Sequence, residues 1–331
     1  MPEINAQTNS DSNENSQLKE LIKQREFGVF IALLIVMAIF TILADNFLSF
    51  TNIISVLRQT AVLGIMAVGM TMLITSNEFD LSVGSIYALS PVFFGLLIKN
   101  YGMNVWVSLT ATVALAILLG MANGLITLTM GIPSFITTLG TQMLFRGVTL
   151  MSTNGWPVSG LPDNALFSVL GGELFGIPSQ VYWFILIVVV GFFILQRSKL
   201  GYKMYATGGN REAAELSGVN TLKTKLYGFV FTAVTATVAG LTSFAYLGSV
   251  SPTQGTGLEL EVIAASVIGG TALSGGTGSI LGAFLGASIM GVVRNGLGLI
   301  GTGAYVKQAL IGLIIVVAVI INVQYGSKNE S

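Results

Sequence analysis

The stretch FGVFIALLIVMAIFTIL, residues 27–43, contains no charged side chain and decides the class of fold. A helix needs about 20 mostly apolar residues to cross the hydrocarbon core of a bilayer, so this run is close to a complete span. Hydrophobic residues make up 53% of the chain and charged residues only 9%, whereas soluble proteins carry about 25% charged residues. The composition therefore predicts an all-α, polytopic membrane protein.

Similar apolar segments recur along the whole chain. After the first they lie at 61–75, 81–98, 106–129, 133–151, 181–195, 226–247, 262–273, 280–298 and 304–321. The sequence thus predicts about ten transmembrane helices. Segments 61–75 and 262–273 are short, and the former can span only if its helix begins earlier, near Asn52. Short, glycine-interrupted segments are typical of broken helices in transporters.

The two ends of the chain are polar. Residues 1–26 predict a disordered cytoplasmic tail, and residues 324–331 a second, shorter one. No small-residue cleavage pattern follows the first apolar run, so we interpret it as a retained span rather than a signal peptide. A single membrane domain is therefore expected over residues 27–323.

The chain has no cysteine, no histidine and a net charge of zero. These absences exclude disulfides, thiol nucleophiles and the usual zinc ligands, and they remove the commonest general base. Zero net charge gives no electrostatic argument for binding nucleic acid. We expect no catalytic residue, metal site or cofactor in this chain, and an enzyme is the least favoured class.

Residues 196–225 form a charged island between the apolar runs. It holds six of the chain's 15 Lys and Arg residues, namely Arg197, Lys199, Lys203, Arg211, Lys223 and Lys225. An inside N-terminus and ten spans place the island and both tails in the cytoplasm, in agreement with the positive-inside rule. The opposite side would keep fewer basic residues, namely Arg58, Lys99, Arg146, Arg294 and Lys307.

The centre of the island has the pattern of a short helix that could insert into a groove on another protein. Asn210 is suited to the N-cap position, and Gly218 lies where the helix would end. Glu212, Glu215 and Leu216 recur between them at helical spacing. The alternative is a solvated loop whose basic residues only set the orientation of the chain.

Matching residues at a constant offset indicate an internal repeat. Residues 123–125 (Asn-Gly-Leu) recur as residues 295–297, and the same offset relates Gly131 to Gly303. Chance is the alternative, because glycine and leucine are abundant. The matches predict two halves of about five spans in inverted orientation, with a transport path near the pseudo-twofold axis.

Acidic side chains open two of the apolar runs, on opposite sides by the span count. Asp80 precedes 81–98, and Glu259 and Glu261 precede 262–273. The favoured interpretation is that each acid accepts hydrogen bonds from the first amides of the next helix. Contact with a substrate hydroxyl, or coupling of Asp80 to a proton or sodium ion, is the alternative.

Several other polar residues, and one glycine-rich run, each allow two interpretations of their role. Asn123, Thr138 and Asn295 suit a polyhydroxy ligand, but such groups also join helices to one another. Arg146 is expected to snorkel to the outer interface, with a carbonyl or acid in the bundle as the alternative partner. The glycine-rich run 269–279 contains no Gly-Lys pair, so close helix packing is favoured over a phosphate loop.

Several motifs in one order resemble the ribose-type (carbohydrate uptake) permease family of ABC importers. They are DLSVGS at 80–85, IPSFITTLG at 132–140, Arg146-Gly147, the segment 208–218, and GLELE at 257–261 followed by VIGGT at 267–271. Within 208–218, the Glu212-Ala213-Ala214 core is similar to the EAA-type coupling loop of importer permeases. The resemblance extends over roughly residues 27–323.

This resemblance implies a multi-pass pore subunit of the bacterial inner membrane, with no ATPase activity of its own. It would work with a second permease copy, two cytoplasmic ABC ATPase domains that bind ATP and Mg, and an extracytoplasmic sugar-binding protein. Within the coupling loop 196–225, the residues that would contact the ATPase are Gly209, Asn210, Arg211, Glu212, Ala213, Ala214, Leu216, Ser217 and Gly218. The expected substrate path includes Asp80, Asn123, Phe135, Thr138, Glu261 and Asn295.

Two departures from the family pattern leave the substrate open. Many members have Gly-Gly-Ile-Asp in place of residues 76–80, and Asp in place of Glu261. We therefore expect import of a monosaccharide or related polyol, without specifying ribose. An ion-coupled secondary transporter of a small polar solute is the alternative, although its candidate acids lie near segment ends.

Overall fold

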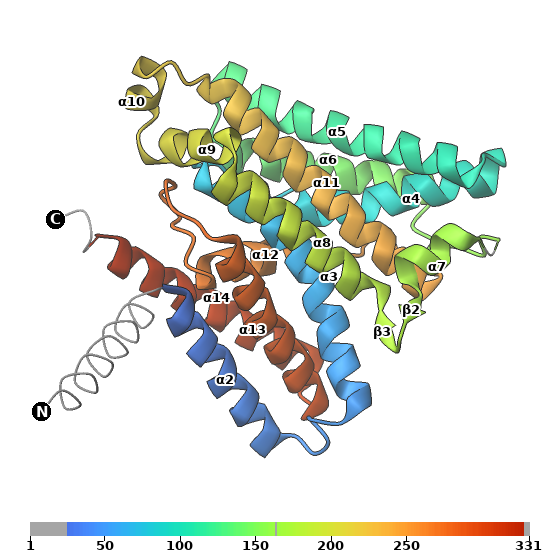
Figure 1. The fold of residues 1–331 in the computed structure, drawn as a ribbon. Helices are drawn as coiled ribbons and strands as arrows, with labels where there is room; N and C mark the ends of the chain where they lie inside the picture. The colour runs from blue at the N-terminus through green and yellow to red at the C-terminus, as the bar shows by residue number, and fades with distance from the viewer. Residues whose placement is uncertain (1–24, 163, 328–331) are drawn as a thin grey trace, which may run out of the picture.

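The computed structural model describes residues 25–162 and 164–327, and most of these residues are helical. Long helices run side by side in a bundle, with α9 (Lys199–Gly209) and α10 (Arg211–Leu216) at one end and α7 (Ala165–Gly171) at the other (Figure 1). The predicted tails lie mostly outside the described residues. Arg25 and Glu26 already belong to the first helix, and 324–327 belong to the last.

Each of the ten predicted apolar segments holds a helix. These are α2 (Arg25–Leu43), α3 (Phe50–Thr75), α4 (Val83–Tyr101), α5 (Val105–Met130), α6 (Ser134–Thr153), α8 (Ser179–Phe192) with a π-helical turn (Phe193–Arg197), α11 (Thr221–Leu247), α12 (Leu258–Ile268), α13 (Ile280–Leu299) and α14 (Ala304–Ser327). Among the described helices, seven are long and apolar enough to cross a membrane. This agrees with a mostly helical, multi-pass membrane protein.

Short strands tie together the loops near α7. β1 (Val158–Ser159) pairs with β4 (Ser249–Val250), and β2 (Glu173–Leu174) pairs with β3 (Ile177–Pro178), both antiparallel. The β1–β4 pair joins the loop after α6 to the loop after α11. Backbone pairing thereby links these two loops at the end of the bundle opposite α10.

The helix α3 begins well before its apolar run, as the span length required. Ser49 is its N-cap and accepts a hydrogen bond from the amide of Asn52. The helix therefore has 26 residues, enough to cross a bilayer. Its second half, from Ala61 to Thr75, is buried almost throughout.

The core is built by small residues that let α11 approach its neighbours. A Cβ on Gly120 of α5 would lie 2.8 Å from the carbonyl oxygen of Phe229 and from the Cα of Val230. Gly69 of α3 and Gly240 of α11 are similarly close to Thr232 and to α4, respectively. Close backbone approach through small residues is the usual way in which membrane helices associate.

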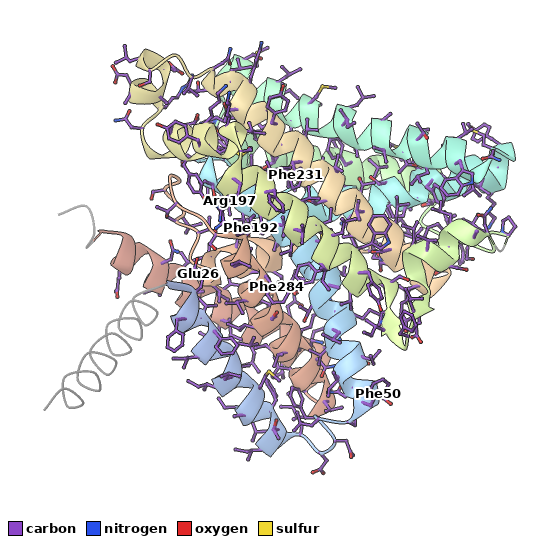
Figure 2. All side chains as sticks on the ribbon, in the orientation of Figure 1. Glu26, Phe50, Phe192, Arg197, Phe231 and Phe284 are labelled. Carbon is purple, nitrogen blue, oxygen red and sulfur yellow. The ribbon has the colours of Figure 1, made fainter. Side chains whose placement is uncertain are left out.

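The outer faces of the bundle carry large apolar side chains. Figure 2 shows side chains projecting all round the helices, with Phe50 at the start of α3. Phe50 is 73% exposed and Ile42 is 84% exposed. Apolar surfaces of this extent mark contact with membrane lipid or with another chain.

Two helices begin inside the bundle rather than at its ends. Residues 76–82, which form turns and irregular backbone, lead into α4, and residues 251–257 lead into α12. The two starts meet, because a Cβ on Gly255 would overlap the carbonyl oxygen of Gly84 and lie 2.8 Å from Tyr87. Gly255 has φ +80°, a conformation that glycine adopts without strain.

Candidate functional site

The charged island forms two short helices that stand out at one end of the bundle (Figure 1). The predicted N-cap is confirmed: Asn210 Oδ1 accepts a hydrogen bond from the amide of Ala213 at 2.9 Å. The predicted helix end is confirmed too, because Gly218 has φ +81° and its amide donates to the Glu215 carbonyl at 2.9 Å. The island is therefore an ordered helical element rather than an open loop.

The surface of α10 mixes charge with one large apolar side chain. Leu216 is 85% exposed, and Arg211, Glu212 and Glu215 are exposed around it. Ala214 alone on this helix is buried, against the rest of the chain. An exposed leucine on a charged helix that projects from a membrane bundle is suited to a groove on a soluble protein.

The helix α9 fastens the island to the core through glycines. A Cβ on Gly208 would overlap the carbonyl oxygen of Thr75, the last residue of α3, and would lie 2.6 Å from the amide nitrogen of Gly276. That amide donates to the Thr75 carbonyl at 3.0 Å. Tyr205 of α9 also donates to the Gly278 carbonyl at 2.7 Å. Three segments thus meet backbone to backbone beneath the island.

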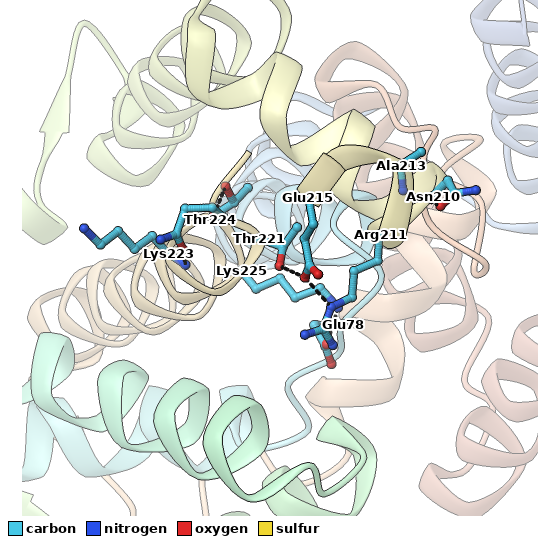
Figure 3. Close-up of polar contacts among 10 residues, drawn as sticks. Glu78, Asn210, Arg211, Ala213, Glu215, Thr221, Lys223, Thr224 and Lys225 are labelled. Carbon is cyan, nitrogen blue, oxygen red and sulfur yellow. Dashed lines mark hydrogen bonds and ion pairs between the residues drawn. The ribbon is translucent and has the colours of Figure 1, made fainter. Parts of the chain in front are cut away.

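Polar side chains fasten α10 to α11 as well (Figure 3). Glu215 Oε1 accepts hydrogen bonds from Arg211 Nε at 2.9 Å and from Thr221 Oγ1 at 2.6 Å. The bonds from Thr221 and Arg211 hold the pKa of Glu215 below its ordinary value. One turn further along α11, Lys225 Nζ forms an ion pair with Glu78 Oε1 at 2.6 Å.

Three of the predicted path residues are brought together near the start of α4. Asp80 is fully buried, and its carboxylate accepts hydrogen bonds from the Ser82 amide at 2.8 Å and from Asn123 Nδ2 at 3.1 Å. Thr138 Oγ1 accepts the amide of Leu81 at 3.0 Å. The N-cap of α4 is Ser82, so Asp80 stabilises the turn before the helix rather than capping it, contrary to the favoured interpretation.

The other predicted path residues lie elsewhere. Glu261 is in the first turn of α12, as expected, and pairs with Arg294 of α13 at 3.3 Å. Asn295, next to Arg294, is buried with its Oδ1 unpaired. Phe135 is 57% exposed on the outer face of α6. The six residues therefore do not share one surface within a single copy of the chain.

Arg146 does not snorkel as expected. Its guanidinium donates to the carbonyls of Pro252 and Gln254, both at 2.7 Å, and to the carbonyl of Gly84 at 3.2 Å. A snorkelling side chain would leave these carbonyls unpaired inside the bundle, which costs more than exposing the charge gains. The alternative partner, a carbonyl in the bundle, is the correct one.

A cavity of about 520 Å³, which the sequence did not indicate, lies at the end of the bundle opposite α10. Arg58 crosses it, donating to the Tyr246 hydroxyl at 2.8 Å and to Glu173 at 3.2 Å. Its lining comes from seven helices and a loop and includes Arg58, Tyr87, Tyr246, Gln254, Arg294 and Lys307. Pockets of about 300–1,000 Å³ are typical of small-molecule sites.

Comparison with known proteins assigns the chain to a family. Residues 52–319 match the family described as the branched-chain amino acid transport system permease component. The chain is 39% identical over 295 residues to the ribose import permease protein RbsC of Escherichia coli K12, covering 88% of this chain and 92% of that protein. It is 36% identical to RbsC of Bacillus subtilis 168, covering 90% and 92%, respectively.

A xylose permease is also similar. The chain is 33% identical to the xylose transport system permease protein XylH of Escherichia coli K12, covering 92% of this chain and 93% of that protein. No solved structure shows a significant match. The extent of these matches shows that the chain belongs to the family of transport-system permease components.

Proposed function

We propose that this chain is the membrane-spanning permease subunit of an ATP-driven ABC importer for a monosaccharide or related polyol, working by alternating access. The observation that carries the proposal is the island at 196–225, an ordered helix pair that is exposed on its outer surface and fixed to the core beneath. Such an element can transmit a movement of soluble ATPase subunits to the helices of the bundle. ATP and Mg would bind to separate ATPase subunits, which would dock on residues 209–218.

The sugar class is supported by the relatives and by the cavity opposite α10, which this proposal places on the outer side of the membrane and which is called the outer cavity below. The named relatives import ribose and xylose. The cavity offers hydroxyl, amide and cationic groups at Tyr87, Gln254 and Arg58, which suit a solute with many hydroxyls. An extracytoplasmic binding protein would deliver the sugar there, so the pore itself need not bind it tightly.

The path is proposed to continue inward from this cavity. Glu261 would act near its outer part, because its partner Arg294 lines the cavity. Asp80, Asn123 and Thr138 form the buried cluster at the start of α4, where they would hold the helices that move. The exposed face of α6 with Phe135 would meet the second permease copy, so that the full path forms between two chains.

Ten crossings with both termini in the cytoplasm fit this arrangement. In addition to the seven apolar spans, the three further crossings would be α6, α12 continued by residues 269–279, and α14. Residues 269–279 reach the island end, since Gly276 contacts Thr75. Asn322 of α14 donates to the Thr271 carbonyl at 3.0 Å, which brings the end of α14 to the same side.

An inverted repeat is also proposed, relating α2–α6 to α8 and α11–α14. In support, α11 packs along α5 as α3 packs along α13. Each half has a helix that begins inside the bundle, α4 or α12. Each also pairs an acid at that start with the fourth helix of its half: Asp80 with Asn123 of α5, and Glu261 with Arg294 of α13. Asn123 and Asn295 occupy matching positions in this scheme.

Sugar uptake by vesicles holding the complete complex tests this function. We expect uptake of a labelled monosaccharide to require ATP and the binding protein, and to survive collapse of the proton and sodium gradients. Uptake that persists without ATP but stops when the gradients collapse would instead establish the ion-coupled alternative.

Changes in the island are expected to uncouple ATP hydrolysis from transport. Glu212→Lys reverses an exposed charge on α10, and Gly218→Val forces a β-branched residue into φ +81°, a strain of about 1–2 kcal/mol. We expect normal membrane insertion but sugar uptake reduced about 5-fold or more, measured against ATP hydrolysis in the same vesicles. Gly218→Asn, which tolerates this φ, is the control; equal uptake by the Val and wild-type chains would contradict the prediction.

A further inference from the structure

The pair Lys225–Glu78 differs from the other ion pairs of the described residues. Its two side chains are only 7% and 12% exposed, and Nζ lies 2.6 Å from Oε1. In each of the other three pairs at least one side chain is 39% or more exposed. Buried charges carry a large desolvation cost unless they are closely paired, so an interaction of this kind holds its two segments in one relative position.

The ion pair joins the start of α11 to the segment that leads into α4. Lys225 is the last residue of the island and lies in the second turn of α11, and Thr221 in the first turn holds Glu215 of α10. Glu78 lies in residues 76–82, the irregular segment that leads into α4. A displacement of α10 would therefore reach residues 76–82 through one helix turn and one ion pair (Figure 3).

Residues 76–82 in turn hold three helices. Phe79 donates its amide to Ser134 Oγ, and Leu81 donates its amide to Thr138 Oγ1, both on α6. Asp80 binds Asn123 of α5 and stabilises the turn before α4. A shift of residues 76–82 would move the starts of α4 and α6 together, which is the kind of discrete rearrangement that coupling between distant sites requires.

We propose that the buried Lys225–Glu78 ion pair transmits motion of the ATPase-docking helix to residues 76–82, and thereby couples ATP hydrolysis to movement of the substrate path. Both residues are positioning residues, since they act through Asp80 and α6 rather than on the sugar. The inference rests on the proposed function. It adds a transmission step inside the membrane domain that is separate from the Gly208 contact.

The neutral double variant Lys225→Met/Glu78→Gln tests this step. Removing both charges avoids a lone buried charge, and such replacements are often neutral for folding. We expect normal amounts of assembled complex and near-normal ATP hydrolysis. The sugar moved per ATP should fall at least about 5-fold below the wild-type value, in the range of 5- to 150-fold typical of coupling energies. The swapped pair Lys225→Glu/Glu78→Lys is expected to restore most of the ratio.

The control is Lys223→Met, two residues away on the same helix but exposed, which should leave the ratio unchanged. If the neutral double variant moves as much sugar per ATP as the wild type, the ion pair does not transmit motion, although the proposed function stands. A neutral variant with a low ratio that the swapped pair fails to raise would also overturn the charge-pair proposal. If the wild-type complex moves no sugar with ATP, the proposed function fails, and this inference fails with it.

Discussion

Gly208→Ala is expected to abolish sugar uptake and to lower the unfolding temperature of the purified complex. The added methyl group would overlap the Thr75 carbonyl oxygen and press on the Gly276 amide, and neither backbone atom can rotate away. Relief would require separation of α9 from α3 and loss of the 3.0 Å bond between Gly276 and Thr75. Overpacking of this kind costs about 1–3 kcal/mol.

The adjacent Gly209 supplies the control for this substitution. A Cβ there would meet only the Cα of Gly276, at 3.8 Å, an ordinary van der Waals contact. Gly209→Ala should therefore keep the unfolding temperature of the wild type. Identical unfolding temperatures for the two alanine variants would show that the backbone contact beneath the island is not tight.

Arg146→Met is expected to lower stability and uptake more than other changes at the end of the bundle that holds the cavity. It removes the donor from the loop carbonyls of Pro252 and Gln254, and each unpaired buried group costs about 1–3 kcal/mol. Because Gln254 and Gly255 line the outer cavity, its shape should change as well. We expect a lower unfolding temperature and loss of sugar uptake at all sugar concentrations.

Lys99→Met is a matched control for this second change. Lys99 also donates to a loop carbonyl, that of Ser159 at 3.0 Å, but the contact is exposed, so water can replace it. Its loss should have little effect on stability or uptake. If Arg146→Met is as stable and active as Lys99→Met, the hydrogen bonds from Arg146 do not hold residues 251–257 in place, and the prediction is wrong.

Features set by neighbours in the sequence could be predicted. The apolar runs located the helices, and the N-cap Asn210 and the helix end at Gly218 followed from local residue preferences. The start of α3 near Asn52 followed from the length that a span requires. The two features of the island rest on interactions within about one helical turn, and the others on apolar runs that are contiguous in the sequence.

Features that depend on distant partners could not be predicted. The carbonyls that hold Arg146 come from residues 84, 252 and 254, and the sequence offers no sign that loop carbonyls point into the bundle. The outer cavity combines side chains from helices between α3 and α14, so no contiguous motif marks it. The same holds for Lys225 of α11 and Glu78 of the segment before α4, which are far apart in the sequence.

The sidedness of α10 tests the central claim most directly, because an ATPase can reach this helix only from the cytoplasm. The chain has no native cysteine, so a single introduced thiol gives an unambiguous label. With a membrane-impermeant maleimide on intact spheroplasts, Trp156→Cys, in the exposed loop after α6, should react, and Glu212→Cys should react only after lysis. Labelling of Glu212→Cys in intact spheroplasts would contradict the account.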